Sequence, residues 1–180
     1  MKNQNTKKLA YAALFLALCL VLPMLTGQIP QIGSMLLPMH IPVLLCGLVC
    51  GWQYGAAVGF VAPLLRSALF GMPPVYPVAI AMAFELLTYG LVIGLVYRRM
   101  AQKGAAGVYA ALLTAMVAGR LVWGVAEVVL LGFGGKAFTA QAFLAGALLN
   151  AVPGIIVQLV LIPAVMAALQ KAGAVKEYAE

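Results

Sequence analysis

Four charged residues lie inside otherwise apolar segments of this sequence: Arg66, Glu85, Arg120 and Glu127. A charge at the centre of a bilayer costs about 2.5–3.5 kcal/mol on insertion scales, so such groups face the interior of a helical bundle and usually serve function. Guanidinium and carboxylate groups bind the charged and hydroxyl groups of small molecules. These residues therefore predict a buried binding site for a polar solute.

The stretch RLVWGVAE, residues 120–127, holds two of these charges and a tryptophan. On a helix, Arg120 and Glu127 lie about 20° apart around the axis and roughly 10 Å apart along it, with Trp123 on nearly the same face. That separation is too long for a relaxed ion pair, and it leaves room for a small molecule stacked on the indole. We predict that this stretch forms one wall of a binding pocket.

Neighbouring segments place further polar residues at a similar depth, in the half of the bundle that we expect to face outward. His40 lies at the outer mouth of the second apolar segment, beside Pro42. The predicted binding residues are Arg120, Glu127, Trp123, Glu85, Arg66, Asn150 and His40. Structural alternatives remain open for them: ion pairs Arg66–Glu85 and Arg120–Glu127, simple packing by Trp123, an interfacial role for His40, and interhelical hydrogen bonds from Asn150 and, with more weight, Gln158.

The elements that position these residues must cross a membrane. Only 8% of the 180 residues are charged and 65% are hydrophobic, with a mean hydropathy of +1.07. An ordinary soluble domain has about 25% charged residues. We therefore predict an all-α membrane protein with one integral membrane domain over residues 1–180. Hydropathy and Gly, Pro and charge punctuation predict six transmembrane helices at 9–26, 40–52, 54–70, 76–99, 105–132 and 138–170.

The basic residues predict the topology. Of 11 Lys and Arg residues, Arg66 and Arg120 lie within the membrane and Lys136 lies outside. The other eight fall on the side of the N-terminus: Lys2, Lys7, Lys8, Arg98, Arg99, Lys103, Lys171 and Lys176. Because positive charge collects on the cytoplasmic side, both termini are predicted to be cytoplasmic. The net charge of +7 thus follows membrane topology, and we expect no nucleic-acid partner.

The remaining features argue against a metal or cofactor site and against cleavage of the first segment. Cys19, Cys46 and Cys50 lie in apolar runs, and no His or Cys set completes a plausible metal site, so they are read as buried hydrophobes. The first segment is read as a retained helix because Leu18 before Cys19 is too large for a lipoprotein cleavage site. The outer connections 27–39 and 71–77 are rich in Pro and Gly, and we predict that they act as lids.

Two short motifs carry a resemblance to a known family. Ala13 and Ala17 form an AxxxA pair on the first helix, and LPMHIPVLLCGLVCGWQYGAAVGF opens the second and third segments. With six segments and outward polar residues, the chain resembles a substrate-binding S component of an energy-coupling factor (ECF) transporter. The resemblance covers the whole chain and implies the S-component bundle.

The resemblance also implies a function. An S component captures a water-soluble vitamin or precursor outside the cell and binds a transmembrane coupling subunit and two cytoplasmic ATPases through a helix 1 face with residues like Ala13 and Ala17. It lies in the cytoplasmic membrane of a prokaryote. The sequence has no GxxxxGK[ST] phosphate loop, so its energy source would be borrowed. The ligand stays open among pantothenate-like, pyridoxine-like and thiamine-precursor-like molecules.

Three other classes compete with this reading. Buried Arg and Glu residues also occur in a stand-alone secondary transporter or a proton- or ion-coupled carrier, although no internal repeat is evident. An intramembrane enzyme is not expected, because neither HExxH nor a GxSxG context for Ser34 or Ser67 occurs. A purely structural or assembly protein is the remaining alternative.

Overall fold

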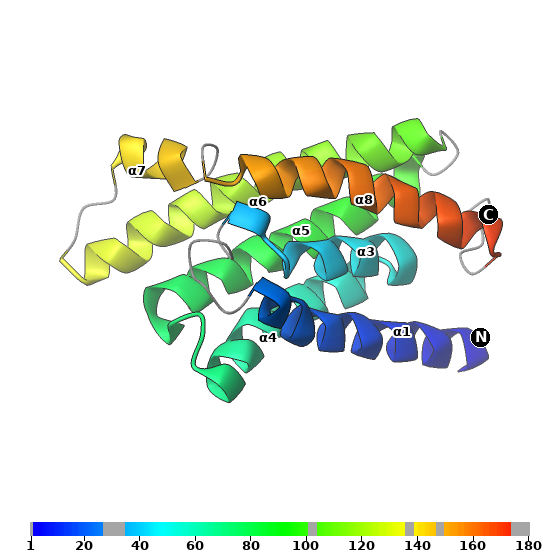
Figure 1. Cartoon of the computed structure of the whole chain (residues 1–180), viewed down its shortest axis with the longest axis horizontal. Coiled ribbons are helices and arrows are strands. Elements are labelled where there is room, and N and C mark those ends of the chain that lie inside the picture. Colours follow the sequence, from blue (N-terminus) through cyan, green and yellow to red (C-terminus); the bar gives the residue numbers. More distant parts are fainter. Residues whose placement is uncertain (1, 27–34, 101–103, 136–138, 147–149, 174–180) are drawn as a thin grey trace.

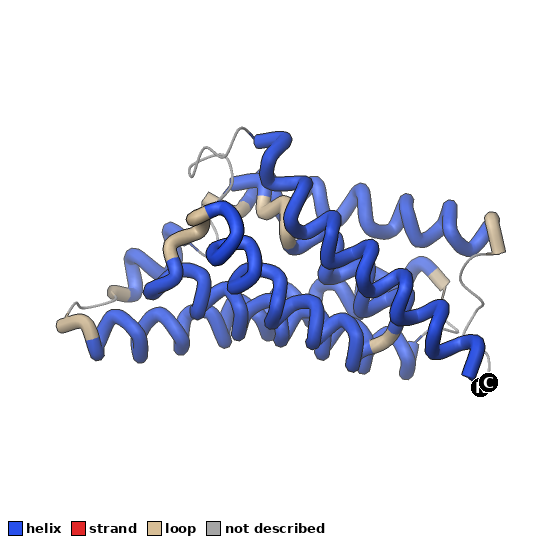
Figure 2. Tube along the Cα trace, turned by 90° about the horizontal axis from the view of Figure 1, so that it is seen from below, coloured by secondary structure: helices blue, strands red, loops and turns tan. Residues whose placement is uncertain are grey.

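The computed structural model describes residues 2–26, 35–100, 104–135, 139–146 and 150–173. Within these ranges every regular element is helical, in agreement with the predicted all-α class. The elements are α1 (Lys2–Val21), η1 (Leu22–Thr26), α3 (His40–Cys50), α4 (Trp52–Phe70), η2 (Val75–Ala79), α5 (Ile80–Met100), α6 (Ala105–Phe133), α7 (Ala140–Leu144) and α8 (Val152–Lys171). The start of α1 and the end of α8 lie at the same end of the bundle (Figure 1, Figure 2).

Helix α5 forms the centre of the bundle. It packs most extensively against α4 on one side and α6 on the other, and α3 contacts it as well. Helix α1 lies against α3 and α4, whereas α8 lies against α6 and α3 (Figure 1). The core between them is filled by large buried side chains, including Leu44, Leu48, Leu86, Tyr89, Ile93, Leu112 and Ile162.

Glycine sets the two ends of α4. Gly51 has φ 96° between α3 and α4, a region that side chains with a Cβ rarely adopt, so the chain can reverse direction within one residue. Gly71 ends α4 with φ 68°, and its N–H donates to the carbonyl oxygen of Ser67 at 2.9 Å. The boundaries predicted for these two helices are therefore close to those observed.

Within the described residues, four helices are long and apolar enough to cross a membrane: Gln4–Leu25, Val75–Met100, Ala105–Phe133 and Val152–Lys171. Helix α3 is apolar but has only 11 residues, and α4 contains Pro63 and the charged Arg66. Six crossings with cytoplasmic termini therefore stay a prediction. Helix α6 has 29 residues, about 43 Å at 1.5 Å per residue, and exceeds a hydrocarbon core of about 30 Å, so it must tilt or protrude.

The segment predicted as one helix over 138–170 differs from the structure. It contains the short helix α7 and the long helix α8, and Pro153 lies in the first turn of α8. Proline is favoured there because the first turn leaves its missing N–H without an intrahelical partner anyway. Thr139 caps α7 by accepting a hydrogen bond from the N–H of Ala142 at 3.2 Å. Residues 136–138 and 147–149 lie outside the described ranges.

The first helix begins earlier than predicted, at Lys2 instead of residue 9, because hydropathy marks the apolar part of a helix and not its polar extension. The predicted lid 71–77 is tied to two helices. The hydroxyl of Ser67 donates to the carbonyl oxygen of Pro73 at 2.6 Å, and the hydroxyl of Tyr76 donates to that of Leu130 on α6. Most of the other predicted lid, residues 27–34 of 27–39, lies outside the described ranges.

Candidate functional site: a buried polar network between three helices

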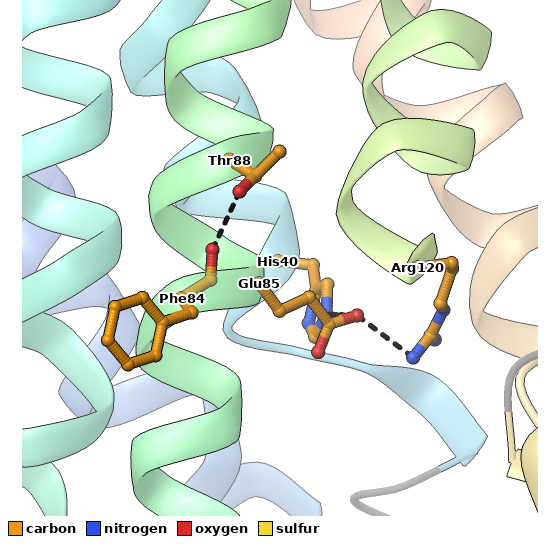
Figure 3. A network of polar contacts seen from close by, with 5 residues as sticks. All are labelled: His40, Phe84, Glu85, Thr88 and Arg120. Atoms are coloured by element: carbon orange, nitrogen blue, oxygen red, sulfur yellow. Dashed lines mark hydrogen bonds and ion pairs between the residues drawn. The ribbon is translucent and has the colours of Figure 1, made fainter. Parts of the chain in front are cut away.

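Three of the predicted residues meet between α3, α5 and α6. The guanidinium Nη1 of Arg120 lies 2.9 Å from Oε1 of Glu85, and Nε2 of His40 lies 3.3 Å from the same oxygen. Figure 3 shows the three side chains pointing toward one another from their separate helices. His40 and Arg120, which are far apart in the sequence, thus meet at the carboxylate of Glu85.

The helices present these side chains through close packing. His40 is the first residue of α3, and its N–H donates to the carbonyl oxygen of Leu37 at 3.0 Å. The ring of Tyr89, one turn after Glu85 on α5, meets the His40 ring edge-on with centroids 5.1 Å apart. A Cβ at Gly119 would lie 2.8 Å from the Tyr89 ring, so only glycine lets α6 approach closely enough beside Arg120.

The network is almost completely buried. His40 and Glu85 are each 1% exposed, and the side chain of Arg120 is 13% exposed. Removing charges from water is costly, and an opposite charge at contact distance offsets much of that cost. The Arg120–Glu85 pair therefore accounts for how these two charges are accommodated between apolar helices.

Several polar atoms of the network have no hydrogen-bond partner among the described residues. They are both ring nitrogens of His40, Oε1 of Glu85, and Nε and Nη2 of Arg120. Glu85 Oε1 is within ion-pair distance of two cationic or imidazole groups, but neither contact has the angles of a hydrogen bond. Buried polar groups in native proteins nearly always have a partner, so this cluster is unusual within the part of the chain that the structure describes.

Trp123 and Glu127 continue the network along α6. The guanidinium carbon of Arg120 lies 5.8 Å from the centroid of the Trp123 ring, and the ring of Phe143 on α7 is stacked on that indole at 6.1 Å. Glu127 is 7% exposed and accepts a hydrogen bond from Trp123. That the stretch 120–127 forms one wall of a binding pocket stays a prediction, and the indole has a protein neighbour in Phe143, which sequence reasoning missed.

Arg66 and Asn150 have different surroundings. Arg66 donates through Nη1 to the carbonyl oxygen of Leu20 at 2.5 Å, and its guanidinium lies 5.3 Å from the Phe70 ring centroid, so it fastens α4 to α1. Asn150 is exposed at the start of α8, where its N–H donates to the carbonyl oxygen of Ala145 at 2.9 Å. A substrate role for either residue stays a prediction without support from these contacts.

The structural ion pairs considered above, Arg66–Glu85 and Arg120–Glu127, do not occur among the described residues; the pair that does form is Arg120–Glu85. Gln158 also departs from its expected role. Its side chain is 1% exposed on α8, yet its amide nitrogen donates to no described residue.

A separate cavity lies at the other end of α3, away from His40. It has a volume of about 280 Å³ and is lined by Lys8, Gly51, Trp52, Tyr97, Arg98 and their neighbours. Its wall includes the turn between α3 and α4 and two basic residues that we assigned to the cytoplasmic side. Sequence reasoning did not predict a cavity at this end of the bundle.

Ala13 and Ala17 are exposed on α1, whereas Ala12, Phe15 and Cys19 form the face that packs into the bundle. These two sets of residues point in different directions around the helix because successive residues are rotated by about 100°. The AxxxA pair is therefore available to lipid or to a partner, as its predicted docking role requires.

The fold and site define a multi-pass helical membrane protein with a buried polar network. A family model described as ECF transporter, substrate-specific component, matches residues 7–166. The chain belongs to this family, and the resemblance seen in the sequence is confirmed. It is thus a substrate-specific subunit of an ECF transporter, and proteins of this family are transporter subunits rather than enzymes. Searches of curated proteins and of solved structures gave no match.

Proposed function

We propose that this chain is the high-affinity capture subunit of an ECF-type importer for a water-soluble vitamin or vitamin precursor, in the cytoplasmic membrane of a prokaryote. The observation that carries the proposal is the His40–Glu85–Arg120 network, which is buried between three helices while several of its polar atoms have no partner among the described residues. Pantothenate-like, pyridoxine-like and thiamine-precursor-like molecules have the charged and hydroxyl groups that such a network can bind.

The proposed partners are a transmembrane coupling subunit and two cytoplasmic ATPases. The exposed small side chains of Ala13 and Ala17 support docking on α1, because small residues let another helix approach closely. Replacing both by Trp should abolish transport and leave substrate affinity unchanged. Val117→Trp, on an exposed apolar position of α6, is the matched control and should retain transport. Loss of substrate binding in the Ala13→Trp, Ala17→Trp variant would contradict a pure docking role.

The test of capture uses the purified full chain. A panel of B vitamins and their precursors is screened by thermal unfolding, because a ligand that binds only the folded state raises the melting temperature. Uptake into proteoliposomes should then require the coupling subunit and both ATPases. Proton-driven uptake by the chain reconstituted alone would overturn the proposal in favour of a secondary transporter, for which buried Glu and His residues are also typical.

A further inference from the structure

The guanidinium of Arg120 uses only part of its hydrogen-bonding capacity. Nη1 lies 2.9 Å from Glu85 Oε1, while Nε and Nη2 are buried without a partner among the described residues. In a guanidinium group the N–H bonds of Nε and Nη2 point in the same direction and form one edge. The spacing of these two donors matches the two oxygens of a carboxylate.

The protein holds this edge in a fixed direction. Glu85 is in ion-pair contact with Nη1 on one side, and the ring of Trp123 lies 5.8 Å from the guanidinium carbon on another. A side chain held in this way is pre-organised for an anion, because little side-chain freedom remains to be lost on binding. A single buried and charged donor without a partner is already rare, and within the described part of the chain Arg120 has two on one edge.

Resting on the proposed function, we propose that the substrate has a carboxylate group and that the Nε–Nη2 edge of Arg120 binds it through two parallel hydrogen bonds. The substrate's carboxylate and Glu85 would then share the guanidinium from different sides. Glu127, the next carboxylate along α6, would accept a hydroxyl or amine group elsewhere on the same molecule.

The surrounding charges favour a carboxylate over a phosphate. Glu85 and Glu127 are both buried and interact electrostatically with each other. A phosphate monoester brings close to two negative charges into this neighbourhood, whereas a carboxylate brings one and repels the two glutamates less. A substrate that also has a cationic or hydroxyl group near Glu127 would lower the repulsion further.

The first experiment identifies what the protein carries. The full chain is purified from cells grown in rich medium and denatured, and the released small molecules are identified by mass spectrometry. Pantothenate against pantothenol and 4-pyridoxate against pyridoxine are added as matched probes, since each pair differs by a carboxylate in place of a hydroxymethyl group. We expect a released ligand with a carboxyl group, and an acid that binds at least tenfold more tightly than its alcohol.

The second experiment assigns that preference to Arg120. Arg120→Lys keeps the positive charge and removes the two-donor edge, so the ratio of acid to alcohol affinity should fall by tenfold or more. Arg98→Lys, at the exposed end of α5, is the matched control and should keep the ratio. An Arg120→Lys protein with a lower melting temperature but an unchanged ratio would assign Arg120 a structural role and overturn the inference.

The two proposals fail in different ways. A released or tightly bound ligand without a carboxyl group overturns this inference and leaves substrate capture intact. A wild-type chain that releases no small molecule, and whose melting temperature none of the vitamins and precursors raises, overturns the capture function and this inference with it.

Discussion

The two sides of α5 are built in opposite ways. Toward α4, glycines let the backbones touch: a Cβ on Gly90 would overlap backbone atoms of Gly55, and a Cβ on Gly59 would overlap those of Leu86. Toward α6 and toward His40 at the start of α3, the same helix presents the carboxylate of Glu85 and the ring of Tyr89. At these glycines the first side has no space for an added atom, while the second side has polar atoms without a hydrogen-bond partner among the described residues.

The α4–α5 contact holds α5 in place, whereas the α5–α6 contact contains the polar network. Where Gly90 meets Gly55 and Gly59 meets Leu86, the α4–α5 contact is backbone against backbone, so the two helices are held at a short and fixed distance. The α5–α6 contact includes the Arg120–Glu85 ion pair and the ring of Tyr89 against Gly119.

The largest effect is expected at Glu85. Glu85→Leu leaves the buried guanidinium of Arg120 without its carboxylate, and breaking a buried pair in this way costs about 3–5 kcal/mol. The double variant with Arg120→Met should recover much of this stability, because both charges are replaced by apolar groups. Thermal unfolding of the ligand-free protein measures both. Equal melting temperatures for wild type and Glu85→Leu would contradict the pairing.

A somewhat smaller loss is expected at the glycine contact. Gly90→Ala forces α4 and α5 apart because backbone atoms cannot move aside, and the expected loss is about 3 kcal/mol of unfolding free energy. Gly132→Ala on α6 is the control, since no atom lies within 4 Å of its added Cβ. That change should stabilise the protein by about 0.5–1 kcal/mol. A Gly90→Ala protein as stable as wild type would show that this contact is not tight.

The same substitution on the other side of α5 should cost less. Gly119→Ala places its Cβ 2.8 Å from the ring of Tyr89, which can shift where a backbone cannot, so we expect a loss of about 1 kcal/mol. Because Tyr89 contacts His40, the substitution should also weaken substrate binding. Calorimetric titration beside thermal unfolding separates the two effects. A loss as large as that of Gly90→Ala would remove the contrast between the two sides.

The smallest change is expected at Glu127. Glu127→Gln keeps the size of the side chain and removes its charge, so substrate affinity should fall by about 1 kcal/mol, the difference between a charge-assisted and a neutral hydrogen bond. The melting temperature of the ligand-free protein should change little, because no ion pair of Glu127 occurs within the described ranges. Unchanged affinity for every substrate tested would place Glu127 outside the binding site.

Much of the fold follows from local patterns. The charged and glycine residues around 98–105 and 51 mark helix ends that the structure confirms at Met100, Ala105 and Cys50. The prediction of one continuous helix over 138–170 was wrong, because hydropathy stays high through both α7 and α8 and an apolar pattern alone does not distinguish a proline inside a helix from one in its first turn.

The sequence could predict which residues belong to the site. Charges in apolar segments single out Glu85, Arg120 and Glu127. Trp123 lies three residues after Arg120 and four before Glu127, which places it on the same face of the helix as those two. The sequence could not predict which group each charged side chain contacts. Arg120 pairs with Glu85 of another helix, and Arg66 donates to a backbone carbonyl of α1, a group that every residue has and that leaves no mark in a sequence.

The amino-acid sequence by itself determined that this chain is a helical membrane protein with charges that must be buried, because hydropathy and the cost of an unpaired charge depend on residue type and spacing along one helix. The tertiary structure alone decided which charge meets which. Residues 40, 85 and 120 lie on three helices, and their meeting depends on how glycines such as Gly90 and Gly119 set the distance and rotation between neighbouring helices. Those contacts leave the Nε–Nη2 edge of Arg120 without a partner among the described residues.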